Sequence, residues 1–156
     1  MSRPVSVLRS LASLLLGLLA ITIVAEAIEF TLVGTLRGDF SQDPERYFAT
    51  RNRPAVLVAK MFYNFFAASV GGAVACLIAP TKRRLHVAGV AALQVLALGF
   101  ALVTPSLRST GPLWMWVSLL PVTVVGLSLG AVMVERRLER SVHGTTSGPV
   151  LRVCSK

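Results

Sequence analysis

Four long apolar blocks, separated by short polar stretches, dominate the pattern of hydrophobic and polar positions along the chain. They cover residues 10–33, 55–79, 85–103 and 113–134. None of them shows the period of an amphipathic helix or of a half-exposed strand. Because about 20 apolar residues suffice for a helix to cross a bilayer, the pattern predicts an all-α polytopic membrane protein. We expect residues 1–140 to form an antiparallel bundle of four transmembrane helices, followed by a flexible tail at 141–156.

The one long polar connection, residues 34–54, contains a helix start at Asp43-Pro44-Glu45. Asp is a favoured N-cap, Pro suits the first helical position and Glu suits the first turn. We therefore predict a short amphipathic helix in this loop, ending near Thr50. Aromatic residues in this loop and at the start of the fourth block are suited to the membrane–water boundary. These predicted interfacial anchors are Tyr47, Phe48, Trp114 and Trp116.

The composition agrees with a lipid environment and gives the orientation. The 156 residues are 54% hydrophobic and 15% charged, and their formal net charge is +9. Ten Lys and Arg residues lie on the side of the two termini and only five on the other side. Because basic residues accumulate in cytoplasmic loops, both termini should be cytoplasmic. The basic clusters, such as Lys82-Arg83-Arg84, are expected to contact lipid headgroups, and no nucleic-acid partner is expected.

The first block also has features of a cleavable signal peptide. A basic start precedes a charge-free stretch at 11–25, and Ala25-Glu26-Ala27 has the form of a cleavage site. The apolar block nevertheless continues to Val33, which favours a retained helix; removal of residues 1–27 is the alternative.

Three charged residues interrupt the apolar blocks. Glu26 and Glu29 lie three positions apart, on one face of the first helix, and Lys60 on the second helix falls at a similar depth. Because charge at membrane depth is costly, we predict a buried cluster of Glu26, Glu29 and Lys60. Lys60 is expected to lie against one of the two acids, which leaves the other protonated, exposed to water or paired elsewhere. The cluster is either a structural clasp or a proton or cation site. Asn64 and Gln94 either extend a polar path or form interhelical hydrogen bonds.

Small residues recur every fourth position in the second and fourth blocks. Such rows let helix backbones approach closely in lipid. The second block contains two rows, Ala68-Gly72-Cys76 and Ala67-Gly71-Ala75. The fourth contains Gly126 and Gly130, which either pack within the bundle or dimerise. The predicted packing residues are Ala68, Gly71, Gly72, Gly126 and Gly130.

Signals of catalysis or metal binding are weak. The chain has no HExxH, GxSxG or Walker motif, and two cysteines (Cys76, Cys154) and two histidines (His86, His143) form no familiar ligand pattern. No catalytic or metal-ligating residue is predicted, and the sequence identifies no cofactor.

The run Gly71-Gly72-Ala73-Val74-Ala75, continued by Ile78-Ala79-Pro80 and a basic turn, resembles small uncharacterised four-span bacterial membrane proteins over residues 67–103. The resemblance implies the topology and a bacterial inner-membrane location. We expect a non-enzymatic accessory or structural subunit that packs against a larger membrane assembly. The expected partners are membrane lipid and either other membrane-protein subunits or further copies of the chain in a homo-oligomer. The alternative is a small transporter or channel component that uses Glu26, Glu29 and Lys60.

Overall fold

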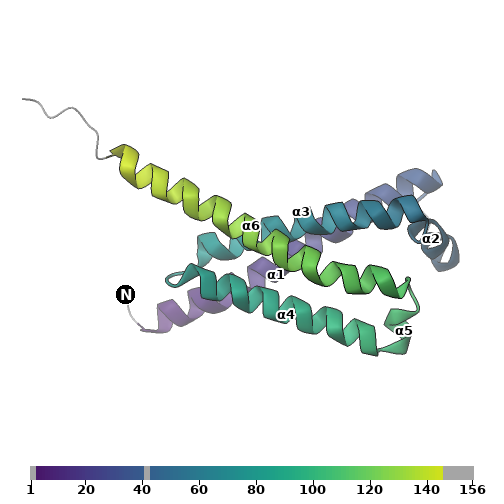
Figure 1. The fold of residues 1–156 in the computed structure, drawn as a ribbon, viewed down its shortest axis with the longest axis horizontal. Helices are drawn as coiled ribbons and strands as arrows, with labels where there is room; N and C mark the ends of the chain where they lie inside the picture. The colour runs from purple at the N-terminus through teal and green to yellow at the C-terminus, as the bar shows by residue number, and fades with distance from the viewer. Residues whose placement is uncertain (1–2, 41–42, 146–156) are drawn as a thin grey trace, which may run out of the picture.

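The computed structural model describes residues 3–40 and 43–145, with side chains described over 5–40 and 43–140, and all regular elements within these ranges are helices. Four helices are long and apolar enough to cross a membrane, and consecutive ones run in opposite directions (Figure 1). They are α1 (Arg3–Arg37), α3 (Pro54–Ile78), α4 (Arg83–Val103) and α6 (Leu113–Thr145). The prediction of an all-α, four-span antiparallel bundle is confirmed.

Two short helices connect the spans. The predicted loop helix is present as α2 (Pro44–Arg51), and the Asp43 carboxylate caps it by accepting from the backbone N–H groups of Glu45 and Arg46 at 3.1 and 3.4 Å. A single-turn helix that the sequence did not predict, α5 (Pro105–Arg108), lies between α4 and α6. Its first residue is a proline, whose fixed φ favours a helix start.

The first and last helices are longer than their apolar blocks. α1 ends at Arg37 because Gly38 adopts a φ of +76° and donates its N–H to the Gly34 carbonyl at 3.0 Å. α6 continues through its charged extension to Thr145, past the predicted domain end at residue 140, and projects beyond the bundle (Figure 1). The prediction that a flexible tail begins at residue 141 is therefore wrong for residues 141–145, which are helical. The rest of the predicted tail, residues 146–156 with Cys154, lies outside the described residues.

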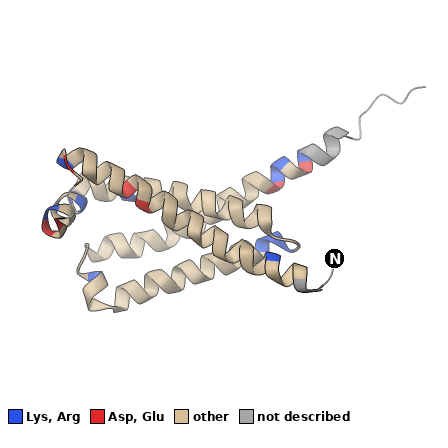
Figure 2. Ribbon diagram, turned by 180° about the vertical axis from the view of Figure 1, so that it is seen from behind, with Lys and Arg blue, Asp and Glu red and all other residues tan. Residues whose placement is uncertain are grey.

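The bundle has two distinct ends. At the α2 end, α1 finishes, α3 and α6 begin, and α2 and α5 lie nearby; at the turn end, the turn after α3 leads into α4, α1 begins and α6 finishes (Figure 1). Charged residues gather mainly at these two ends, with few along the helices between them (Figure 2). This distribution is that of helices whose middle parts lie in hydrocarbon.

α3 is the central helix, and its most extensive contacts are with α6 and α1. A Cβ on Gly72 would overlap the backbone of Leu127 in α6, and a Cβ on Gly130 would overlap the backbone of Ser69 in α3. Gly126 is similarly close, 2.6 Å from Phe65 O to the position of a Cβ. Gly126 and Gly130 therefore pack within the bundle, which is the first of the two alternatives that the sequence left open, the other being dimerisation.

α1 packs against the opposite side of α3. The position of a Cβ on Gly71 would lie 2.8 Å from the carbonyl oxygen of Gly17 in α1, and Ser13 donates a 2.7 Å hydrogen bond to the carbonyl of Ala75. Adjacent glycines in α3 thus serve different neighbours, since Gly71 faces α1 and Gly72 faces α6. The contacts of α3 with both neighbours are close because these glycines have no side chain.

Candidate functional site

Glu29 lies on the face of α1 that packs against the bundle. Its side chain belongs to a row of buried residues spaced four apart along α1, and it is only 3% exposed. The row consists of Ser13, Gly17, Ile21, Ala25, Glu29 and Val33. A carboxylate in such a row loses its hydration, so it requires compensating donors and cations.

Four side chains supply this compensation. Lys60 Nζ and the Tyr63 hydroxyl both contact Oε2 of Glu29. The Tyr47 hydroxyl donates to Oε1 at 3.1 Å, and Arg51 Nε lies 2.6 Å from the same oxygen. The N–H of Arg51 is not aligned with that oxygen, so this contact is an ion pair rather than a hydrogen bond. We call these five residues the carboxylate cluster.

Local structure brings the four donors to Glu29. Lys60 and Tyr63 are three positions apart in α3 and therefore share a face. Tyr47 and Arg51 are four positions apart in α2, whose start is set by its Asp43 cap. α2 lies against the ends of α1 and α3, as the right side of Figure 1 shows. The cluster thus joins three helices at the α2 end.

The chemistry of the cluster suits a clasp. One carboxylate faces two cations and two phenols, and both of its oxygens are engaged. Burial, together with the neighbouring Glu29 carboxylate, raises the pKa of Tyr47 to about 12, so its hydroxyl remains a donor at neutral pH. Charge-assisted hydrogen bonds of this kind are stronger than neutral ones.

Glu26 does not belong to the cluster, so this part of the sequence prediction is wrong. Its side chain is exposed, and it forms no hydrogen bond or ion pair with the described residues. The buried face of α1 is a narrow stripe that follows the four-residue row, and a residue three positions before Glu29 lies to one side of it. The Glu26 carboxylate is still near enough to interact electrostatically with Lys60 and Tyr47.

The two intramembrane amides do not connect helices. Asn64 donates to the carbonyl of Lys60 in its own helix at 2.8 Å. Gln94 is half-buried on α4 and has no hydrogen bond with the described residues. The expected interhelical hydrogen bonds are therefore absent from this part of the chain, and the two amides form no path to the cluster.

The predicted interfacial anchors divide between inward and outward positions. Tyr47 points into the bundle toward Glu29, contrary to the prediction, because the buried carboxylate needs donors. Phe48 is exposed, with its ring edge-on to Tyr47 and the Arg51 guanidinium 5.6 Å from its centroid. At the start of α6, Trp114 is 50% exposed and Trp116 is half-buried.

Three residues that contribute to the carboxylate cluster or to the α1–α3 contact were not identified from the sequence. Tyr63 and Arg51 complete the carboxylate cluster, and Ser13 provides the hydrogen bond between α1 and α3. The signal for Ser13 was present, because Ser13 and Gly17 form a small-residue pair four positions apart. Arg51 had no such signal, since its role depends on how the loop folds. All five predicted packing residues are buried: Ala68, Gly71, Gly72, Gly126 and Gly130.

Within the described residues, no group of three or more His, Cys, Asp or Glu side chains is gathered as metal ligands would be. Cys76 is buried, with its sulfur 3.8 Å from the carbonyl oxygen of Ala131. Comparison of the chain with models of protein families, with curated proteins and with solved structures finds no match.

Proposed function

We propose that this multi-pass membrane protein is a non-enzymatic accessory or structural subunit that packs through its transmembrane helices against a larger membrane assembly. The observation that carries the proposal is the position of Glu26. An ionisable side chain at membrane level is costly without a partner, yet Glu26 is exposed on the outer side of α1. We infer that a Lys or Arg side chain of a neighbouring protein pairs with it.

The surroundings of Glu26 fit a helix-docking surface. Ile23 and Phe30, at neighbouring positions of α1, are 57% and 52% exposed, so the carboxylate is framed by apolar side chains. α1 is also the least buried of the four spans. A partner helix lying along α1 would cover this apolar surface and could also supply a cation for the Glu26 carboxylate.

The transporter alternative has less support. Glu29, the acid best placed for a relay, has both oxygens engaged by four side chains within the chain. Asn64 is bonded within its own helix, so the polar side chains do not continue from the cluster along α3. These contacts favour a structural role for Glu29 and leave Glu26 as the outward-facing acid.

The membrane and the orientation are also part of the proposal. The excess of basic residues at the turn end and in the tail supports a cytoplasmic turn end with both termini inside, and the proposed location is a bacterial inner membrane. Cys154 should then react with a membrane-impermeant maleimide only from the cytoplasm. The buried Cys76 should stay unlabelled in the folded protein. Labelling of Cys154 from outside would overturn this orientation.

Site-specific photo-crosslinking in the native membrane tests the subunit role. A photoreactive residue at Ile23 should capture a defined partner protein, and Glu26→Gln in the same chain should reduce that product. Leu96 on α4, which is 68% exposed, provides the matched lipid-facing control and should give no protein product. Capture only of a second copy of this chain at position 23 would contradict the accessory role and favour a homo-oligomeric transporter. Equal products at positions 23 and 96 would also contradict it.

A further inference from the structure

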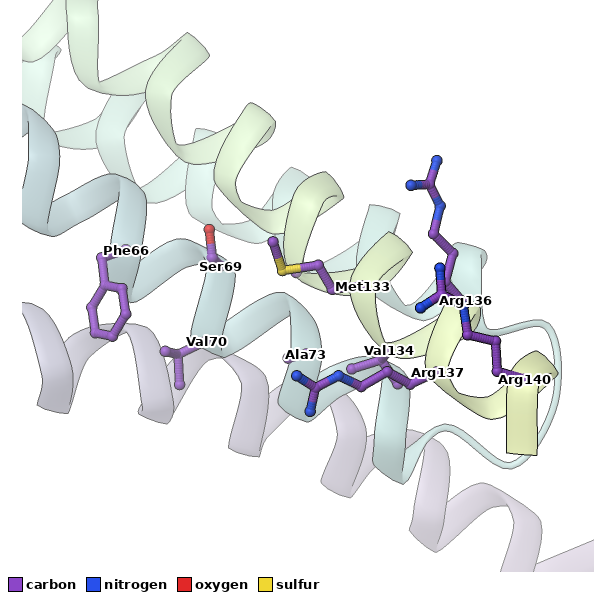
Figure 3. Close-up of a pocket in the computed structure, with 10 residues that line it drawn as sticks. Phe66, Ser69, Val70, Ala73, Met133, Val134, Arg136, Arg137 and Arg140 are labelled. Carbon is purple, nitrogen blue, oxygen red and sulfur yellow. The ribbon is translucent and has the colours of Figure 1, made fainter. Parts of the chain in front are cut away.

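A groove lies between α3 and α6 on the surface of the bundle, toward the turn end (Figure 3). Its volume is about 500 Å³, within the range of small-molecule sites. Most of its lining is apolar and comes from both helices, with Phe66, Val70 and Ala73 on α3 and Met133 and Val134 on α6. Because both helices are membrane spans, lipid has direct access to the groove.

Three arginines close the groove at the turn end: Arg136, Arg137 and Arg140. All three are exposed, and none forms an ion pair with the described residues. The nearby carboxylate of Glu135 is already engaged by Arg84, whose guanidinium lies 3.1 Å from it. In Figure 3 the Arg137 side chain extends back along the groove toward Ala73. Glu139 is the one carboxylate between Arg136 and Arg140 on this part of α6, so the rim carries more positive than negative charge.

Along the two helices, the groove lining changes from apolar to cationic, as a lipid changes from acyl chain to headgroup. On α3, Phe66 lies farthest from the turn end and Ala73 lies seven residues nearer to it, about 10 Å at 1.5 Å per residue. The three arginines come last on α6, beyond the apolar side chains. Apolar surface thus faces the membrane interior and the cationic rim lies at the headgroup level.

From this arrangement we propose that the groove is a binding site for one anionic phospholipid. An acyl chain lies along Phe66, Val70 and Met133, and the headgroup phosphate is held by the arginines at the rim. Guanidinium groups suit phosphate because their N–H donors match its oxygens in pairs. Basic pockets between transmembrane helices are a known form of anionic-lipid site. This proposal is independent of the subunit role, since it concerns α3 and α6 rather than the outer side of α1.

Native mass spectrometry of the full-length protein provides the test. The protein is released from micelles containing phosphatidylglycerol and phosphatidylcholine in equal amounts, and the lipid retained on the protein is counted. We expect one phosphatidylglycerol molecule to be retained in preference to phosphatidylcholine. The triple variant Arg136→Gln, Arg137→Gln and Arg140→Gln should lose about tenfold in affinity, equivalent to about 1.4 kcal/mol.

Two further variants distinguish lipid binding in the groove from non-specific attraction of the lipid by positive charge. Arg9→Gln, Lys82→Gln and Arg83→Gln remove the same charge from the same end outside the groove and should leave lipid retention unchanged. Met133→Trp, at a 55% exposed position that lines the groove, should lower retention without changing the charge. Helicity and melting temperature measured on each variant show that it is folded.

Three results would overturn the proposal. Equal loss of phosphatidylglycerol in the two triple variants would mean that net charge alone attracts the lipid. Unchanged retention in Met133→Trp would mean that no acyl chain occupies the groove. Complete displacement of the lipid by millimolar inorganic phosphate would mean that the arginines bind the anion without its acyl chains.

Discussion

The two sides of α3 hold their neighbours in different ways. Toward α6, the contact consists of glycines whose missing side chains let the two backbones touch, at Gly72, Gly126 and Gly130. Toward α1, the turn-end half uses the same device at Gly17 and Gly71, but the α2-end half is joined by a buried carboxylate and its donors. The first kind of contact fails when atoms are added. The second fails when a charged group is removed.

Removal of the carboxylate should have the largest effect. Glu29→Gln leaves the buried Lys60 and the Arg51 guanidinium without their counter-charge, and stranding one member of a buried pair typically costs about 3–5 kcal/mol. The free energy of unfolding in detergent, measured by denaturant titration, should fall by that amount. Glu26→Gln, three positions away and exposed, is the matched control and should change it by no more than about 1 kcal/mol. Equal losses in the two variants would show that the cluster does not hold the bundle.

Adding side-chain atoms to the α3–α6 contact should cause the second largest loss of stability. Gly130→Leu drives a side chain into the backbone of Ser69, and overpacking of this kind costs about 1–3 kcal/mol. The melting temperature in detergent should fall, and the helix content should persist. Gly99→Leu on α4 is the control, because nothing lies within 4 Å of the added Cβ. It should be neutral or stabilising, since Leu is a better helix former than Gly. A similar loss in both variants would contradict the packing of α6 against α3.

Tyr47→Phe should have a smaller effect that depends on pH. The variant loses one hydrogen bond to a carboxylate, a bond of a kind that contributes about 1.5–3 kcal/mol, with the lower value expected for a half-buried hydroxyl. Folding raises the pKa of Tyr47 from 10 to about 12. The stabilisation is therefore fully present below pH 10 and is lost as the pH rises through about 12. The stability difference between the wild type and Tyr47→Phe, measured from pH 8 to 12, should shrink in this window. A difference that stays constant would mean that the hydroxyl does not bond to Glu29.

Ser13→Ala should have the smallest effect. It removes the hydrogen bond to the Ala75 carbonyl, and single interhelical bonds in membranes contribute about 0.6 kcal/mol on average. Ser128→Ala is the control, because Ser128 is exposed and bonds to Val124 in its own helix. Ser13→Ala should lower the free energy of unfolding measurably more than Ser128→Ala does. Equal effects of the two variants would mean that the Ser13 hydrogen bond does not stabilise the α1–α3 contact.

The same division explains how much could be predicted from the sequence. Small-residue spacing marked both sides of α3 correctly, because close approach of helices in lipid requires small residues at four-residue intervals. The partners of Glu29 could not be fully predicted, because Arg51 and Tyr47 reach it only through the packing of α2 against α1, which the sequence pattern does not specify. The choice between Glu26 and Glu29 depends on which stripe of α1 faces α3, and two acids three positions apart fit either choice. Ser13 and Gly17 would have indicated the stripe, since Glu29 lies in their row and Glu26 does not.

The most direct test of the central claim, that Glu29 rather than Glu26 holds Lys60 within the bundle, is a pair of double-mutant cycles on the free energy of unfolding. Lys60→Met is combined with Glu29→Gln in one cycle and with Glu26→Gln in the other. Residues in direct contact couple by about 0.5–3 kcal/mol, whereas independent sites add to within about 0.3–0.5 kcal/mol. We predict clear coupling between Lys60 and Glu29, with the double variant less destabilised than the sum of the single variants, and near-additivity between Lys60 and Glu26. Coupling of Lys60 to Glu26 that equals or exceeds its coupling to Glu29 would contradict the account.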